Sequence, residues 1–570
     1  MARHDGTKRG WLARAALAAG AAGAMMAGVV ASPALAASTG YDALAKLFDE
    51  WRAFERPAMV DGAADYGAAA MARKAAGLSA FRDRLAAIPT AGWTQAELVD
   101  HRLVAAEING LDFDLRVLRP WARDPAFYVS VWPHRTDVPS RDAPVSFPEI
   151  ELYNYKFPLA KADQAVLARQ FAAIPGFLAQ ARVNLKDSNA RDLWVYGTQS
   201  LRNQAQALAM LEAGTLTVTT LEGAWNANLA GASPALRAAV AKARAATEDF
   251  VRWLEAEAPG KTGPSGVGKE NYSWYLKNVH LVPYSWDDEV ALLRRELERA
   301  HATLKLEEHN NRALPPLLPA DDKASLDRLA AERLDRFVAF LVDDGIIPDK
   351  PYLKESLVPQ TVRFVPPGDR QFFAHVTHRE PMLLYAHDYH WIDLARMRDE
   401  PHASPIRRRT LLSNIWDSRA EGFATGFEEL VMHAGLYDDN PRARELVWIM
   451  LANRAARGLA SLYVQANMWT LEQAGLFQAE WTPRGWAGAR DSLTTFEQLL
   501  YLRQPGYGTS YISGKLLFDR LLTRYAHAQD KAGKPFALRE LMRQFNDAGM
   551  IPTTAIEQEL VPPTTPGLGE

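Results

Sequence analysis

The stretch PALRAAVAKARAATEDFVRWLEAEA, residues 234–258, indicates the fold class of this chain. Its apolar residues Leu236, Val240 and Ala243 are spaced by four and then by three. This spacing places side chains on one face of a helix, so the stretch predicts a long amphipathic helix.

The same helical pattern recurs along most of the chain. Residues 41–52 and 287–306 show it clearly, with charged residues on the opposite face. Alternation typical of strands occurs at 215–220 and 362–365, where β-branched residues allow a small sheet or none. We therefore predict a mostly α fold with little or no β-sheet.

The composition is that of a globular protein. Of 570 residues, 48% are hydrophobic, and 65 Lys and Arg face 68 Asp and Glu for a net charge of -3. This balance offers no strong positive field for polyphosphate, so we expect no nucleic-acid partner. The chain has no Cys, which excludes disulfides, thiolate metal sites and cysteine nucleophiles.

The N-terminus has the features of an export signal. Lys8 and Arg9 precede an apolar run over 15–30, and small residues at 34 and 36 fit a cleavage site. Residues 7–12 resemble a twin-arginine signal with Lys in the first Arg position, so both export routes stay open. We predict a signal peptide over 1–36, a periplasmic or secreted protein, and no integral membrane span after its removal.

A Gly/Pro-rich stretch at 259–268 divides the rest of the chain. We predict a helical N-terminal half over 37–269, a helical half that bears the site over 270–562, and a tail over 563–570.

One motif in the Gly/Pro-rich stretch resembles a phosphate-binding loop without being one. Residues 263–269 fit G-x-x-x-x-G-K, but the next residue is Glu270, where a hydroxyl residue should hold Mg²⁺. A carboxylate there would repel phosphate, so we predict an interhelical loop and no nucleotide partner.

Histidines cluster between residues 375 and 402. The string 385–394 contains no Pro or Gly and can form one continuous helix. Residues three apart then share a face, which pairs His387 with His390, and His390 with Asp393. Imidazole and carboxylate ligands suit Zn²⁺ or a similar divalent ion. The alternative is a helix whose His and Asp residues cap, pair or face solvent.

A second acidic segment follows at 418–429. Glu421 and Glu428 are seven residues apart and fall on one helix face. Glu421 is flanked by Ala420 and Gly422, whose small side chains allow another helix to approach closely. Such a carboxylate is either functional or a buried partner of an arginine.

Several motifs occur in the order found in a known family. They are GKENY at 268–272, EGFA at 421–424, RAAR at 454–457, WTLEQA at 469–474, PGYGTSYISG at 505–514 and a shortened closing segment at 545–552. Together they resemble the bacterial family known as domain of unknown function 885, over about Gly268 to Leu560 and more weakly before it. The resemblance implies an exported, mostly helical protein related to HExxH-type zinc peptidases.

The departures from that family fall on its zinc motif, H-E-x-x-P-G-H-H, which corresponds to residues 387–394. His387 is kept, Asp388 stands at the general-base Glu, and Asp393 and Leu394 replace the two later histidines. The Pro-Gly bend is absent, and Asn546 replaces a further family His. The resemblance thus implies metal ligands drawn from the following residues: His387, His390, Asp393 and Glu421.

The resemblance also implies roles for other residues in this cleft. Asp388 would act as acid or base, Tyr511 would donate to a developing oxyanion, and Arg457 would orient a carboxylate or Tyr511. The expected substrate-binding residues are His375, His378 and Trp391.

These observations leave three interpretations open. The favoured one is an exported enzyme acting on a small or peptide-like substrate. It would be either a metallopeptidase-like hydrolase with one divalent metal such as zinc, or a metal-free lyase or isomerase. The second is an inactive binding protein that retains the cleft. The third moves the site to an aromatic and basic cluster in the N-terminal half, which could equally be a packed loop: Trp121, Tyr128, Trp132, His134 and Arg135.

Overall fold

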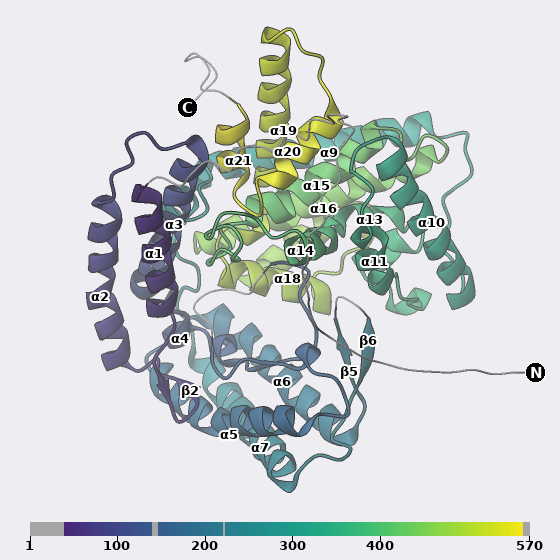
Figure 1. Ribbon diagram of the computed structural model, residues 1–570. Helices are drawn as coiled ribbons and strands as arrows, with labels where there is room; N and C mark the ends of the chain where they lie inside the picture. Colours follow the sequence, from purple (N-terminus) through teal and green to yellow (C-terminus); the bar gives the residue numbers. More distant parts are fainter. Residues whose placement is uncertain (1–38, 140–145, 221–222, 562–570) are drawn as a thin grey trace, which may run out of the picture.

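The computed structural model describes residues 39–139, 146–220 and 223–561, and these form a mostly helical protein (Figure 1). The mostly α prediction is confirmed. The named strands of the described residues are short and pair two by two. The predicted signal peptide and tail lie outside the described residues, and the division near residue 269 stays a prediction.

Three N-terminal helices stand side by side at the left of Figure 1: α1 (Thr39–Phe54), α2 (Ala68–Ala86) and α3 (Gln95–Phe113). The helix predicted at 41–52 is part of α1, and its Leu44, Leu47 and Trp51 are buried as the spacing requires. These helices belong to the same hydrophobic core as most of the C-terminal helices.

A second core lies in the lower part of Figure 1, among α5 (Lys161–Asn184), α6 (Arg191–Ala213) and α7 (Pro234–Glu257). The last of these is the helix predicted at 234–258. It starts at Ser233, whose hydroxyl accepts a hydrogen bond from the Leu236 amide at 3.2 Å and so caps the first turn.

The two predicted β segments differ in outcome. Residues 215–220 contribute β5 (Leu216–Thr219), which pairs antiparallel with β6 (Ala224–Ala227). Residues 362–365 form no strand, because no neighbouring segment supplies a pairing partner there. β-branched residues raise strand propensity, but only a hydrogen-bonded partner makes a strand.

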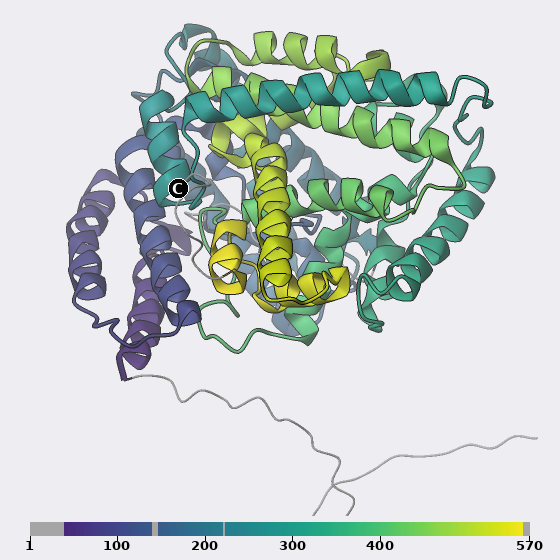
Figure 2. The same cartoon turned by 90° about the horizontal axis from the view of Figure 1, so that it is seen from above.

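Long helices of the C-terminal half pack together and are well seen from above (Figure 2). They are α9 (Trp286–Asn310), α15 (Asp417–His433), α16 (Pro441–Gln465) and α19 (Tyr507–Lys531). α9 contains the helix predicted at 287–306 and lies along α16, and α15 lies along α19.

Shorter elements connect these layers. They are β1 (Met59–Val60), β2 (Ala63–Ala64), α4 (Pro120–Arg123), β3 (Val131–Trp132), β4 (Ile150–Glu151), α8 (Lys269–Asn278), α10 (Lys323–Asp343), α11 (Tyr352–Leu357), α12 (Phe372–Thr377), α13 (Met382–His387), α14 (Tyr389–Asp399), α17 (Leu471–Trp481), α18 (Ser492–Arg503), α20 (Leu538–Asp547) and α21 (Thr553–Leu560).

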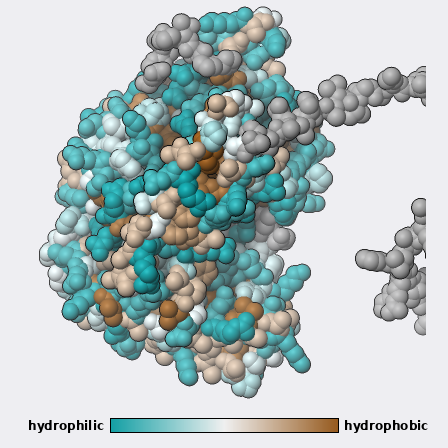
Figure 3. All heavy atoms as spheres, turned by 60° about the vertical axis from the view of Figure 1, so that its left-hand side comes forward, coloured by the Kyte–Doolittle hydropathy of each residue, from teal (hydrophilic) through white to brown (hydrophobic). Residues whose placement is uncertain are grey.

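Among the residues that the structure describes, no helix combines the length and the apolar character needed to cross a bilayer. On the face in Figure 3, hydrophobic residues form small separate patches among hydrophilic ones.

Two buried carboxyl groups make stability depend on pH. Burial raises the pKa of Glu107 in α3 and of Glu289 in α9 to about 7, although Arg52 opposes this at Glu107 and the Tyr272 hydroxyl opposes it at Glu289. Between about pH 4.5 and pH 7, both carboxyl groups therefore keep a proton in the folded protein. In the unfolded chain, where each pKa is near the ordinary value of 4.5, they have already lost it.

We expect the free energy of unfolding to fall as pH rises from about 4.5 to about 7, by roughly 3 kcal/mol for each carboxyl group. Above about pH 7, these two groups should cause no further decrease. Glu289→Gln should flatten part of this slope and stabilise the protein at pH 8. Urea unfolding at pH 5, 6, 7 and 8 measures it. A slope unchanged by Glu289→Gln would show that this carboxyl does not titrate in the window.

Candidate active site

The predicted histidine helix is broken at Asp388, and this break shapes the site. α13 ends at His387 and α14 begins at Tyr389, while Asp388 between them has a ψ of 10° instead of the helical value. The prediction of one continuous helix over 385–394 was wrong. Asp has a low propensity for helix interiors. At this position a tighter turn forms, in which the Trp391 amide donates to the Asp388 carbonyl.

The break lets both histidines meet one carboxylate of α15. His390 Nε2 lies 3.1 Å from Glu421 Oε2, and His387 Nε2 lies 3.5 Å from the same oxygen. The three side chains offer ligand atoms that all lie within 4.8 Å of one another. Two imidazoles and one carboxylate can therefore share a single cation.

A second layer of residues orients these groups. Glu428 Oε1 lies 3.1 Å from His387 Nδ1, the ring nitrogen that faces away from Glu421, and Arg454 Nη2 lies 3.0 Å from the same nitrogen. Arg454 holds Glu428 through two hydrogen bonds of 2.5 and 2.6 Å. The predicted common face of Glu421 and Glu428 is confirmed, since both contact His387. A carboxylate behind a histidine is the usual support of a metal ligand.

The close helix approach predicted beside Glu421 is also present. A Cβ atom added to Gly422 would lie 2.3 Å from the Cα of Gly514 and 2.9 Å from the Ser510 carbonyl oxygen. α15 and α19 thus touch through their backbones here. This contact places Tyr507, at the start of α19, where its hydroxyl donates to Glu421.

The charges of the cluster follow from its burial. Burial opposes an imidazolium, but the Glu421 carboxylate raises the pKa of His390 to about 9. Burial favours a neutral Glu421, yet His390 and His387 bring the pKa of this carboxyl well below its usual range. His390 and Glu421 are therefore an ion pair at neutral pH without a metal.

The neighbouring oxygen acids are held neutral. Burial, followed by the negative charge of Asp137, raises the pKa of Asp388 well above its ordinary value. Burial and Glu421 do the same for the pKa of Tyr507 and of Tyr511. These groups are thus placed to donate hydrogen bonds or protons near neutral pH.

The cluster opens onto a cavity of about 600 Å³ that both halves of the chain line. Residues between 126 and 138, with Ser146 and Glu149, supply one wall, and α13, α15, α16, α18 and α19 contribute to the others. The lining is largely apolar and aromatic. It includes the following residues: Phe127, Trp132, His134, Arg135, Asp137, Val138, Phe373, Leu384, His387, Asp388, Trp416, Glu421, Arg457, Phe496, Tyr501, Tyr507 and Tyr511.

The N-terminal aromatic and basic cluster is part of the same cavity. Trp132, His134 and Arg135 line it, whereas Trp121 and Tyr128 are buried in the second core. The two locations that the sequence leaves as alternatives are therefore joined in one site.

Two of the predicted catalytic residues stack on each other in this cavity. The guanidinium carbon of Arg457 lies 4.4 Å from the ring centre of Tyr511. Arg457 is also paired with Glu497 of α18, and it is 3% exposed. The arginine therefore fixes the Tyr511 ring, as one of its two predicted roles requires.

Asp393 does not join the cluster. Its Oδ2 accepts from Arg419 Nη1 at 2.9 Å, and its Oδ1 accepts from Arg396 Nη2 at 2.7 Å. The predicted set of His387, His390, Asp393 and Glu421 is therefore corrected by removing Asp393. The physical reason is the break at Asp388, which turns His390 toward Glu421, while Arg419 holds Asp393.

The predicted substrate-binding residues lie outside the cavity lining. The His375 ring stacks on Trp486 with ring centres 5.3 Å apart. His378 is buried and accepts a hydrogen bond from the Val365 amide at 2.9 Å. Trp391 is buried in the core. The structure gives these three residues packing contacts in place of cavity contacts.

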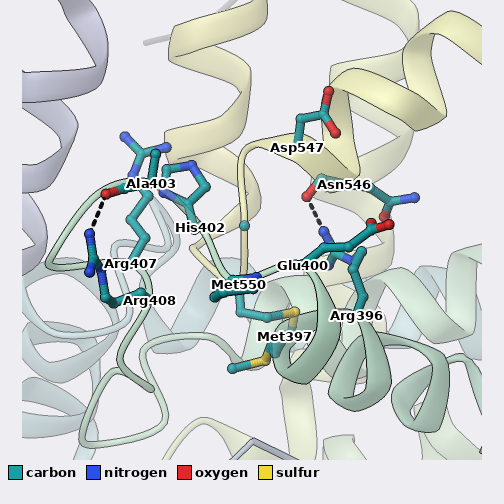
Figure 4. Close-up of a pocket in the computed structure, with 12 residues that line it drawn as sticks. Arg396, Met397, Glu400, His402, Ala403, Arg407, Arg408, Asn546, Asp547 and Met550 are labelled. Atoms are coloured by element: carbon teal, nitrogen blue, oxygen red, sulfur yellow. Dashed lines mark hydrogen bonds between the residues drawn. The ribbon is translucent and has the colours of Figure 1, made fainter. Parts of the chain in front are cut away.

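A second cavity, of about 290 Å³, lies where the Asp393 network reaches the surface (Figure 4). Arg396 and Asn546 line one side of it, and Arg396 donates to the Asn546 carbonyl. Arg407, Arg408 and His402 line the other side. Asn546 also binds Arg419, at 3.0 Å, so two of the positions at which the resemblance implies a family histidine, Asp393 and Asn546, meet at one arginine.

The glycine-rich stretch is used for packing. The Gly268 amide donates to the Gln465 carbonyl at 2.8 Å, and the Gly266 amide donates to the Asn467 side chain at 2.8 Å. These two amides already have protein partners.

Sequence reasoning missed Tyr507 and Arg454. Their signals were present: Tyr507 lies four residues before Tyr511, and Arg454 lies three before Arg457. Each pair shares a helix face, so both members face the same site.

The comparisons place the chain in a family. Residues 53–334 match the sequence profile of the family described as "Bacterial protein of unknown function (DUF885)", and the chain belongs to this family. The matched residues overlap the segment of the predicted resemblance, 268–560, only over 268–334. No curated protein matches the chain.

Two solved structures share the fold. One is described as "a putative lipoprotein of unknown function from Shewanella oneidensis", with 15% identity, a TM-score of 0.63, and coverage of 92% of this chain and 99% of that one. The other is "the putative lipoprotein from Colwellia psychrerythraea", with 13% identity, a TM-score of 0.61, and coverage of 91% and 98%. At these identities the likeness concerns the fold alone.

Proposed function

We propose that this protein is an exported, divalent-metal-dependent hydrolase that cleaves amide bonds in small or peptide-like substrates. The observation that carries the proposal is the convergence of His387, His390 and Glu421 at the wall of a cavity. The orientation of His387 by Glu428 supports it.

The donor set fits zinc. Two imidazoles and one carboxylate are a ligand set found in catalytic zinc sites, which keep a further position open for water. With His390 in place of Asp393, the set carries one anionic oxygen donor group instead of two. When bound, such an ion polarises a carbonyl group and acidifies water.

The surrounding residues suit amide hydrolysis. In this reaction water adds a C–O bond at the carbonyl carbon, the C–N bond breaks, and the leaving nitrogen gains a proton. Asp388 lines the cavity next to His387 and holds a proton that it can give to that nitrogen, and the proton that the added water loses then restores the Asp388 carboxyl group. Tyr511 can donate to the oxygen that gains charge, and Arg457 keeps its ring in place.

One observation favours a second candidate, a metal-free acid/base enzyme. His390 and Glu421 already neutralise each other as an ion pair, so the cluster is electrostatically satisfied without a cation. In that case Asp388 and His390 would transfer protons themselves.

The export part of the proposal rests on the signal-like residues 1–36 and agrees with the lipoprotein descriptions of the two similar structures. Fractionation of cells that express the full chain would test it.

The decisive test is the metal content and amide hydrolysis of the purified protein. We expect about one zinc per chain, lost with His390→Gln and Glu421→Gln, and a loss of hydrolysis in both variants. Glu428→Gln should bind zinc about 10- to 100-fold more weakly, because it removes the support of His387.

Two variants serve as controls. Asp393→Asn and His375→Gln should keep the metal, since neither side chain joins the cluster. Turnover in metal-free protein that His390→Gln abolishes would support the second candidate. Zinc retained in Glu421→Gln, or no metal and no turnover, would overturn the proposed hydrolase.

A further inference from the structure

One wall of the cavity is a short segment of the N-terminal half, residues 132–138. Its start pairs with Glu151 through β3 and β4, and the Arg135 amide donates to the Thr219 carbonyl at 2.9 Å. The Thr219 amide donates in turn to the Pro133 carbonyl at 3.2 Å. The segment is therefore held against the rest of the protein by backbone hydrogen bonds.

This segment brings two uncompensated charges into the cavity. Arg135 and Asp137 both line it, and neither side chain forms a hydrogen bond or ion pair with another of the described residues. Arg457 and Arg503 also line the cavity, but Glu497 and Asp124 neutralise them. Charged groups that converge on a cavity without protein partners are typical of ligand recognition.

The two charges differ in their place relative to the metal cluster. Asp137 lines the cavity together with His387, Asp388 and Tyr507, so it shares the space onto which the cluster opens. Arg135 precedes Asp137 by two residues, which limits their Cα separation to about 7 Å. An extended dipeptide is also about 7 Å long and carries opposite charges at its two ends.

The cavity lining also contains buried polar atoms that lack a hydrogen-bond partner among the described residues. Asp388 Oδ2 and Arg457 Nε are buried and have no hydrogen-bond partner in the described part of the chain, and their residues are 6% and 3% exposed. Buried polar atoms without partners are costly, and a polar ligand that draws on them would remove that cost.

The remaining lining is apolar. Trp132, Phe373, Trp416 and Phe496 surround the same space, and Phe496 remains 61% exposed despite its size. Apolar or aromatic side chains of a ligand would cover these rings.

We propose that the cavity binds unblocked short peptides, dipeptides above all, with apolar side chains. Asp137 receives the free ammonium group beside the metal cluster, and Arg135 receives the free carboxylate. This inference rests on the proposed function for the fate of the peptide, but binding itself requires no metal.

The test is calorimetric titration of the full chain, freed of metal by a chelator, with leucyl-phenylalanine. The N-acetylated and the C-amidated forms of the same dipeptide are titrated alongside. Wild-type protein should bind the free dipeptide at least about tenfold more tightly than either blocked form, since each loses one charge-assisted contact.

Single variants assign each charge to one end of the peptide. Asp137→Asn should bind the free and acetylated forms equally, and Arg135→Gln should bind the free and amidated forms equally. Asp137→Glu and Arg135→Lys should restore part of the preference, which separates charge recognition from misfolding. Arg408→Gln, in the second cavity, is the matched control and should bind like wild type.

Equal binding of free and blocked dipeptides by wild-type protein, no binding of any of them, or unchanged preferences in both variants would overturn the inference. Absence of zinc or of turnover in the purified protein would count against the proposed hydrolase. It would not affect the test of peptide binding, because the titration uses metal-free protein.

Discussion

Gly422→Ala is expected to destabilise the protein by roughly 3 kcal/mol, well beyond an ordinary surface substitution. The new methyl carbon would lie 2.3 Å from the Cα of Gly514, an atom of the α19 backbone that no side-chain rotation can move aside. The two helices must separate, and the gain in helix propensity of about 1 kcal/mol from replacing glycine does not offset this.

Gly176→Ala is the matched control. Gly176 also lies inside a long helix, α5, but its Cβ would meet nothing within 4 Å. This variant should be neutral or more stable by about 0.5–1 kcal/mol. Urea unfolding followed by circular dichroism measures both. Equal stability of the two variants would contradict the close contact of α15 and α19.

The contact also matters for the site. Glu421 precedes Gly422, and Tyr507 opens the helix that would have to move. Folded Gly422→Ala should therefore bind zinc more weakly than wild type.

Arg419→Met is expected to cost about 3–5 kcal/mol, because it leaves the buried Asp393 without its main partner. The Arg419 side chain is fully buried, donates to Asp393 at 2.9 and 3.1 Å, and lies 4.3 Å from the ring centre of Phe545. Burial lowers the pKa of Arg419, while the negative charge of Asp393 opposes this.

Adding Asp393→Leu to Arg419→Met tests whether the loss comes from the stranded carboxylate. The double variant should recover part of the stability, because an apolar pair of similar volume replaces a buried ion pair. Denaturant unfolding of the two single variants and the double variant gives the coupling energy. A double variant as unstable as the sum of both singles would show that the two residues act independently.

These two contacts illustrate how far sequence reasoning reached. Helical periodicity predicted α7 almost residue by residue, since this signal is local. The small neighbours of Glu421 correctly indicated a close helix contact. The partner of that contact, Gly514, lies 92 residues away, and no local signal names it.

The candidate ligands show the same division. His387, His390 and Glu421 were all among the residues chosen from the sequence, but so was Asp393. The choice between His390 and Asp393 depended on a break of one residue at Asp388 and on the position of Arg419. Helix spacing pairs His390 with both His387 and Asp393, and it does not by itself exclude Asp393 as a ligand.

By itself, the sequence determined the mostly helical architecture, the helices at 41–52, 234–258 and 287–306, and a short list of candidate metal-binding side chains, because propensity and periodicity act within a few residues. The tertiary structure alone decided which members of that list meet. It also joined residues 132–138 to the histidine cluster in one cavity. Contacts between segments more than 200 residues apart arise from core packing, and such distances leave no mark in local spacing.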